Sequence, residues 1–267
     1  MSKVVIVTGA SAGIGKSICT LLSNKGYTVY GLSRRKVNDE PFFNFQVDVT
    51  DLSSINHAID TIIEKEGKID ILVNNAGMGI SGSVENTQLE DAKRLFEVNF
   101  FGAVQLIQQV VPHMRSNGSG KIINVSSLAA NFPIPFQTFY SASKAALSNF
   151  SHALHNELKP FNIHVSVILP GDIRTEFTKH REKNEQDDAA YGNRIKKSIE
   201  TMEKDEQNGM DPMVISKKVL QLIRLKHMPI ESTVGIQYKL MLFIKRFVSV
   251  TFVNRILGMM YGFTKKK

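Results

Sequence analysis

The sequence predicts an α/β fold, with a parallel sheet wound by helices on both faces in three layers and built as a single domain. From residue 3 to about residue 172, short β-branched or aliphatic runs alternate with longer segments of helical periodicity. Several of these runs are apolar without alternation, which is typical of strands covered on both faces. With 267 residues, 42% of them hydrophobic and 22% charged, the chain is long enough to bury one sizeable core.

The order of the elements favours parallel pairing, because a helix that follows a strand can return the chain across the sheet. The strands are expected at Val4–Thr8, Thr28–Leu32, Phe43–Val47, Ile69–Asn74, Lys121–Ser126 and His164–Leu169. The helices between them are expected to include Ile14–Asn24, Ser53–Glu66, Leu89–Met114 and Tyr140–Leu158. Residues 1–237 are expected to hold this domain.

A charged segment follows the last predicted strand. Residues 175–211 are dense in Lys, Glu, Gln and Asn and contain no long apolar run. Because ligands in open α/β sheets bind beyond the carboxyl ends of the strands, we expect this segment to be a substrate lid. A solvated surface insertion is the alternative.

Residues 238–267 form an apolar and basic extension of the same domain, which is expected to be helical. Lys239, Lys245, Arg246 and Arg255 interrupt its apolar run, which is therefore shorter than the roughly 20 residues of a membrane-spanning helix. Three interpretations stay open. The extension packs on the domain or a sister subunit, makes peripheral contact with an anionic membrane, or forms a lipophilic wall of the substrate pocket.

The composition argues against several classes of protein. Cys19 is the single cysteine, so no internal disulfide can form and a reducing, cytoplasmic location is expected. The net charge of +8 would attract polyanions, but no basic run is interleaved with aromatic residues, so no nucleic-acid partner is expected. The seven histidines include no H-E-x-x-H motif, and no metal is expected.

A glycine-rich turn joins the first predicted strand to the first predicted helix, which is the context of a dinucleotide-binding fingerprint. It reads Thr8-Gly9-Ala10-Ser11-Ala12-Gly13-Ile14-Gly15. Gly9 would permit the tight turn, Gly13 the approach of a pyrophosphate, and Gly15 the close packing of helix on strand. Ser11 and Ile14 are expected to contact the cofactor with them. An ordinary strand-to-helix turn is the alternative.

The end of the second strand indicates which cofactor binds. It carries Ser33, Arg34 and Arg35, where an acidic side chain would hydrogen-bond the ribose next to adenine. Guanidinium groups suit a 2′-phosphate, so NADP(H) is preferred and NAD(H) is the second choice. Two solvated surface arginines are the alternative. Further expected cofactor contacts are Asp48, Val49, Asn75, Ala76 and Gly77.

A candidate catalytic group centres on Tyr140 and Lys144, which are four residues apart and therefore project from one helix face. An ammonium near the phenol would lower the tyrosine pKa toward the working range of an acid/base. Ser127, at the end of the fifth strand, could hydrogen-bond a substrate oxygen that gains negative charge. Asn99 lies inside a periodic helix that Asn does not favour, which suggests a kink and a water anchor.

In this order and spacing, the motifs resemble those of the short-chain dehydrogenase/reductase family. The matching segments are T-G-x-x-x-G-I-G at residues 8–15, N-N-A-G at 74–77, Asn99, Ser127, Y-x-x-x-K at 140–144 and P-G-x-x-x-T at 170–175. The resemblance implies a Rossmann-type sheet of about seven strands, hydride transfer from a nicotinamide, and a homodimer or homotetramer. It also implies an Asn-Ser-Tyr-Lys tetrad, with Tyr140 as proton donor, and cofactor contacts at Pro170, Gly171, Ile173 and Thr175. Ala12 stands where many NADP-preferring members carry a second basic residue.

The expected substrate is a lipophilic ketone, aldehyde or secondary alcohol that resembles a steroid, a retinoid or an acyl derivative. The residues expected to contact it are Ser127, Leu128, Phe132, Phe136, Tyr140 and Phe177. Two other functions stay open at this point. One is a regulator that binds NADP(H) without catalysis, and the other is a peripheral membrane protein that binds through residues 238–267.

Overall fold

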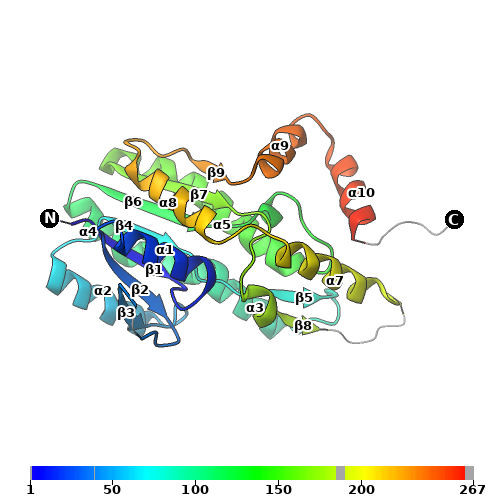
Figure 1. The fold of residues 1–267 in the computed structure, drawn as a ribbon, viewed down its shortest axis with the longest axis horizontal. Helices are drawn as coiled ribbons and strands as arrows, with labels where there is room; N and C mark the ends of the chain where they lie inside the picture. The colour runs from blue at the N-terminus through cyan, green and yellow to red at the C-terminus, as the bar shows by residue number, and fades with distance from the viewer. Residues whose placement is uncertain (1, 39, 185–189, 262–267) are drawn as a thin grey trace.

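The computed structural model describes residues 2–38, 40–184 and 190–261. Its main sheet has seven strands, all parallel, in the order β3-β2-β1-β4-β6-β7-β9 (Figure 1). The strands are β1 (Val4–Thr8), β2 (Thr28–Ser33), β3 (Phe43–Gln46), β4 (Ile71–Asn74), β6 (Gly120–Val125), β7 (Ile163–Leu169) and β9 (Glu231–Thr233). The predicted Rossmann-type fold is therefore confirmed, with the reversal of strand order between β1 and β4.

Helices cover both faces of this sheet. On one face α1 (Gly13–Ser23) and α8 (Met213–Arg224) pack over β1 through Val5 and Val7. On the other face α2 (Leu52–Glu66), α4 (Gly102–Ser116) and α5 (Thr138–Leu158) pack over Val4 and Ile6 of the same strand. Alternate residues of one strand thus enter two separate cores, which explains why the strand sequences are apolar without alternation.

The six predicted strands are present with ends that differ by at most two residues. The edge strand β9 was not predicted from the sequence, because three residues of mixed polarity give no recognisable strand pattern. It also predicted one helix over Leu89–Met114. The structure divides this region into α3 (Leu89–Phe96), a π-helical turn at Glu97–Phe101 and α4. The interruption includes Asn99, where the sequence suggested a kink.

The segments beyond the carboxyl ends of the strands form a second layer of structure. A two-stranded sheet joins β5 (Ile80–Gly82) to β8 (Glu182–Asn184), next to α6 (Phe177–His180) and α7 (Arg194–Gln207). After β9 the chain forms α9 (Ile236–Lys245) and α10 (Val250–Met260), which stand apart from the sheet at the upper right of Figure 1. The expected lid and C-terminal extension correspond to these two regions, and residues 185–189 and 262–267 of them lie outside the described residues.

Candidate active site

A cavity of about 800 Å³ lies at the carboxyl ends of the parallel strands. The segments that follow β1, β2, β3, β4, β6 and β7 all contribute to its wall, as expected for a ligand site in an open α/β sheet. The predicted cofactor residues on this wall are Gly9, Ser11, Gly13, Ile14, Ser33, Arg34, Arg35, Asp48, Val49, Asn75, Ala76, Gly77, Tyr140, Lys144, Pro170, Gly171, Ile173 and Thr175. Residues that were predicted from their spacing in the sequence therefore lie together on one wall, although they come from six different strand ends.

Gly15 is the predicted cofactor residue that does not line the cavity. A Cβ atom at Gly15 would lie 2.2 Å from the carbonyl oxygen of Gly9, so only glycine allows α1 to begin this close to the turn. The turn is also tied to the next strand, because the Thr8 hydroxyl accepts hydrogen bonds of 2.9 Å from the backbone N–H groups of both Asn75 and Ala76. The N-terminus of α1 is thereby fixed at the cavity, where it favours an anionic group.

Two exposed arginines border the cavity at the end of β2. Arg34 and Arg35 both line it, and Arg35 Nη2 lies 3.5 Å from Ser11 Oγ on the glycine-rich turn. Ser33 is buried and its hydroxyl donates to the Arg35 carbonyl oxygen at 2.7 Å, which shapes this turn of the backbone. The arrangement brings two cations beside the position at which the helix N-terminus attracts phosphate.

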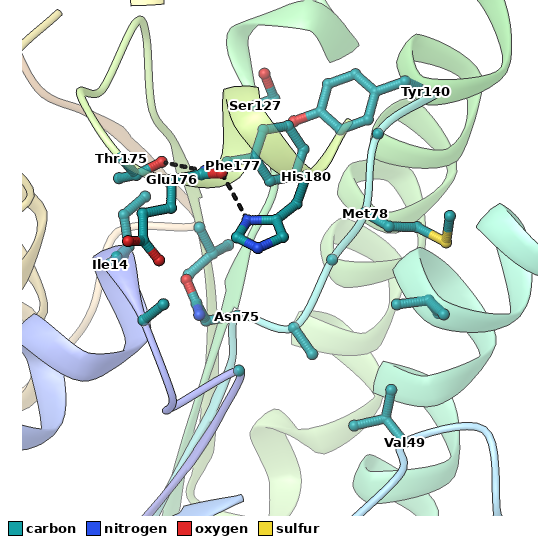
Figure 2. Close-up of a pocket in the computed structure, with 18 of the residues that line it drawn as sticks. Ile14, Val49, Asn75, Met78, Ser127, Tyr140, Thr175, Glu176, Phe177 and His180 are labelled. Atoms are coloured by element: carbon teal, nitrogen blue, oxygen red, sulfur yellow. Dashed lines mark hydrogen bonds between the residues drawn. The ribbon is translucent and has the colours of Figure 1, made fainter. Parts of the chain in front are cut away.

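The hydroxyl groups of Ser127 and Tyr140 lie close to each other on the wall of the cavity (Figure 2). Ser127 follows β6 and Tyr140 stands in the first turn of α5. Burial raises the pKa of Tyr140 to about 12, although the Ser127 hydrogen bond opposes the rise. The charge of Glu206 adds to the rise and that of Arg181 opposes it. Tyr140 is therefore protonated at neutral pH and available as a proton donor.

Lys144 lies one helical turn along α5 from Tyr140 and is buried. Its Nζ donates a 3.0 Å hydrogen bond to the carbonyl oxygen of Val125 and lies 5.9 Å from the centre of the Tyr140 ring. Burial lowers the pKa of Lys144 to about 8. The structure differs here from the expectation that Lys144 lowers the pKa of Tyr140. Desolvation of the phenol outweighs the attraction to an ammonium whose own charge is disfavoured by burial.

Both polar atoms of the Asn99 side chain form hydrogen bonds, and two of these bonds hold Met78 in the segment after β4. Its Oδ1 accepts from the Met78 N–H at 2.8 Å, and its Nδ2 donates to the Met78 carbonyl oxygen at 3.0 Å and to Ser143 Oγ at 3.1 Å. Asn99 is buried and is not part of the cavity wall, whereas Met78 is. The π-helical turn places this amide beside helix α5, and π turns of this kind often occur at functional sites.

Three of the predicted substrate contacts belong to apolar clusters in the structure. Leu128 and Phe132 pack in a cluster with Leu257 and Tyr261 of the C-terminal region, and Phe136 packs with α7. These three residues are buried in clusters outside the cavity lining. Apolar contacts with the C-terminal helices bury Leu128 and Phe132, and contacts with α7 bury Phe136. Among the other predicted substrate contacts, Ser127, Tyr140 and Phe177 do line it.

Several cavity residues gave no signal in the sequence. Gln137, Glu176, His180 and Glu206 line the cavity, the last three from the expected lid (Figure 2 labels Glu176 and His180). Glu176 and His180 follow Thr175 closely, so the motif at 170–175 could have led to them. Glu206 is more than thirty residues away in sequence and is placed by an ion pair with Arg181, whose side chain is 1% exposed. No local pattern encodes that contact.

The sequence matches a known protein family. The family model described as short chain dehydrogenase matches residues 3–186, well over half of the chain. The chain belongs to the short-chain dehydrogenase/reductase family. It is 39% identical over 236 residues to a 3-ketodihydrosphingosine reductase from Bacteroides thetaiotaomicron, covering 87% of this chain and 88% of that relative.

Solved structures agree with this assignment. A short-chain dehydrogenase from Streptomyces avermitilis superposes with a TM-score of 0.84 and 27% identity, covering 96% of this chain and 97% of the other. A serine dehydrogenase complexed with NADP+ gives a TM-score of 0.75 and 27% identity over 86% of this chain and 94% of the other. As a member of this family, the protein is an oxidoreductase that acts on CH–OH and C=O groups and binds a nicotinamide dinucleotide.

The described residues lack two further features, a cluster of metal ligands and a membrane-spanning helix. Within residues 2–38, 40–184 and 190–261, no three or more His, Cys, Asp or Glu side chains come together as a candidate metal site. No helix in the same ranges combines the length and the apolar character needed to cross a membrane.

Proposed function

We propose that the protein is an NADPH-dependent reductase of a lipophilic, long-chain ketone that carries a cationic head group next to the carbonyl. The observation that carries the proposal is one cavity that is lined both by the neighbouring hydroxyl groups of Ser127 and Tyr140 and by Arg34 and Arg35. The first pair suits a carbonyl oxygen, and the second suits the phosphate that distinguishes NADPH from NADH.

The residues present fit this cofactor. The glycine-rich turn packs tightly on the segment after β4, since a Cβ atom at Gly9 would lie 2.9 Å from the Asn75 side chain. The N-terminus of α1 and the neighbouring Ser11 would hold the pyrophosphate, and Arg34 with Arg35 would hold the 2′-phosphate. The small residues at 75–77 would lie along the nicotinamide half. When bound, NADPH supplies the hydride that reduces the carbonyl carbon.

The side chains of this protein would manage the proton. Ser127 donates a hydrogen bond to the ketone oxygen and so stabilises the negative charge that develops on it. Tyr140, whose raised pKa keeps it protonated, transfers its hydroxyl proton to that oxygen and recovers a proton from solvent. Lys144 supports the cofactor ribose from its buried position, and Asn99 is a positioning residue that holds Met78 on the cavity wall.

Two observations support the substrate class. The 39% identical relative is a 3-ketodihydrosphingosine reductase, and identity at this level extends over nearly the whole of both chains. In addition, Glu206 lines the cavity close enough to Tyr140 to contribute to the rise in its pKa. An ammonium group next to the reacting carbonyl would therefore meet a carboxylate.

A panel assay tests the proposal. Purified protein is given NADPH or NADH with long-chain 2-amino-3-ketones, steroid ketones, retinal and short alkyl ketones, and the loss of cofactor absorbance is followed. We expect turnover with NADPH and the amino ketone. Tyr140→Phe should lower kcat by about 10²–10⁴-fold while NADPH binding persists, because only the proton donor is lost. Full activity in Tyr140→Phe would contradict the mechanism.

Cofactor choice has its own matched pair of variants. Arg34→Ala should weaken NADPH binding about tenfold or more and leave NADH binding nearly unchanged, since a charge-assisted hydrogen bond contributes about 1.5–3 kcal/mol. Arg224→Ala, which removes an exposed arginine at the end of α8, is the control and should change neither constant. Equal losses for both cofactors in Arg34→Ala would show that this side chain does not contact the 2′-phosphate.

A further inference from the structure

The C-terminal helices carry a wide apolar surface that faces solvent. We call it the C-terminal apolar face, and its exposed residues are Ile236, Leu240, Met241, Phe243, Ile244, Phe247, Val250, Phe252, Ile256, Met259 and Met260. Ile236 is 84% exposed, Phe247 74% and Val250 72%. So many large apolar side chains exposed on two successive helices are typical of an interaction site.

These helices are apolar on two sides, and one side is already used. Tyr238, Leu242 and Val253 turn inward with Leu257 and Tyr261, and they pack against the cluster that contains Leu128 and Phe132. The opposite side of this segment carries apolar residues at positions 236, 240 and 243 of α9 and at 247 just after it, which is the spacing of a single helical stripe. The inward stripe anchors the helices to the domain, so the outward stripe is presented in a fixed orientation.

The charge of this region indicates the chemistry of its partner. Residues 236–267 contain seven basic residues and no Asp or Glu, while the net charge of the entire chain is +8. Nearly all of the net charge thus belongs to this region. Lys239, Arg246 and Arg255 are exposed beside the apolar face, and lysines 265–267 lie beyond the described residues. Apolar residues flanked by cations without any carboxylate match an anionic lipid surface.

The same charge argues against a second copy of the chain as the partner. A two-fold symmetric contact places a surface patch against itself. The cations of one copy would then face the cations of the other, with no carboxylate in residues 236–267 to compensate them. Like charges opposed across an interface cost several kcal/mol. An anionic membrane removes this repulsion because the lipid head groups supply the counter-charge.

The apolar face lies directly behind the wall of the cavity. The ring of Tyr238 packs on Gly171 so closely that a Cβ atom at Gly171 would lie 2.3 Å from it. Gly171 itself lines the cavity. The Tyr238 hydroxyl also donates to the Asp172 carboxylate at 2.8 Å and accepts from the Asp172 N–H at 3.1 Å. One residue layer therefore separates the cavity from the helix that carries the apolar face.

We propose that the C-terminal apolar face docks on an anionic lipid membrane and holds the substrate cavity next to the bilayer. Phe243, Phe247 and Phe252 enter the boundary between head groups and acyl chains, and the flanking lysines and arginines contact anionic head groups. The delivery of a ketone from the lipid rests on the proposed function, whereas docking itself does not. Docking would hold the cavity close to the bilayer, where a lipophilic ketone is concentrated.

Cosedimentation with vesicles tests the docking. The full chain, without cofactor or ketone, is mixed with phosphatidylcholine vesicles that either contain or lack phosphatidylglycerol. We expect binding to the anionic vesicles and at least tenfold weaker binding to the neutral ones. Phe247→Glu should reduce the binding at least tenfold. Leu89→Glu is the matched control, because Leu89 is 60% exposed on α3 and should leave binding unchanged.

A second variant separates charge from apolar insertion. Lys239→Gln combined with Arg246→Gln should weaken binding to anionic vesicles about 30-fold, since each basic residue near the surface contributes about 1 kcal/mol and 1.4 kcal/mol is tenfold. The folding of every variant is checked by its thermal transition. Substitutions are preferable to deletion of the helices, which would expose Leu128 and Phe132.

Three results would overturn the docking proposal. The first is wild-type protein that stays in the supernatant with anionic vesicles, and the second is a folded Phe247→Glu variant that binds as well as wild type. The third is a dimer in size-exclusion chromatography that Phe247→Glu converts to a monomer, without vesicle binding by either protein. NADPH turnover of detergent-dispersed ketone is measured without vesicles, so a failure of the reductase assignment is seen separately.

Discussion

The buried charge of Lys144 should lower the stability of the fold, although we propose that the same side chain supports the cofactor. Burial lowers its pKa from the ordinary 10.5 to about 8, and at about 1.4 kcal/mol per pKa unit this corresponds to about 3 kcal/mol against folding with the charge in place. Lys144→Met removes the buried charge and also the hydrogen bond to the Val125 carbonyl oxygen, which contributes about 1.5 kcal/mol. We therefore expect Lys144→Met to be inactive yet more stable by about 2 kcal/mol at pH 7.

The pH dependence gives this prediction its sign. The unfolded chain binds a proton at Lys144 up to about pH 10.5, whereas the folded chain releases it above about pH 8. The destabilisation is therefore fully present below pH 8, diminishes between pH 8 and 10.5, and vanishes above. The advantage of Lys144→Met should shrink over the same interval and then reverse, because the lost hydrogen bond remains a cost.

Urea unfolding of the cofactor-free protein at pH 7 and pH 10 measures both effects. In a separate thermal scan at pH 7, the same gain in stability should raise the unfolding midpoint of Lys144→Met by about 5 °C. Lys25→Met, which removes an exposed lysine, is the control and should change stability by less than about 0.5 kcal/mol. A Lys144→Met protein that is less stable than wild type at pH 7, or a difference that does not change by pH 10, would refute the reasoning.

Three further predictions concern the cavity. Gly15→Ala should weaken NADPH binding more than tenfold in a fluorescence titration, because its Cβ would displace the Gly9 carbonyl; wild-type affinity would contradict the close packing. Ser127→Ala removes a hydrogen bond that lowers the pKa of Tyr140, so kcat should fall about 10²–10³-fold and the pH profile of alcohol oxidation should move to higher pH; an unmoved profile would count against the pair. Phe132→Ala should lower the free energy of unfolding by about 3–5 kcal/mol but leave the KM for the ketone nearly unchanged. A raised KM would show that Phe132 contacts the substrate.

The parts of the fold that the sequence could predict are those encoded locally. Uninterrupted apolar runs such as Val4–Thr8 mark strands that enter two cores, and the fixed spacing from Ser127 to Tyr140 marks a strand end and the helix that packs beside it. The spacing between Gly9 and Gly15 is local in the same way. Each of these signals depends on neighbouring residues or on the topology of one crossover.

The parts that could not be predicted depend on contacts between distant segments. Phe132 and Phe177 are equally apolar in the sequence, yet only Phe177 faces the cavity, because the C-terminal helices cover Phe132. Glu206 reaches the cavity through its pairing with the buried Arg181. The pKa of Tyr140 was predicted in the wrong direction because i,i+4 spacing reports proximity to Lys144 but not how much water burial removes from the phenol.

The π-helical turn at Glu97–Phe101 determines the angular relation between α3 and α4. A residue added to an α-helix rotates everything after it by about 100°. Loss of the extra residue in this turn would therefore swing Leu106, Val110 and Met114 of α4 out of the core, together with the displacement of Asn99 from Met78. Single-residue insertions and deletions in this helix would therefore disrupt both the packing of the core and the contact between Asn99 and Met78, so the fold constrains its length.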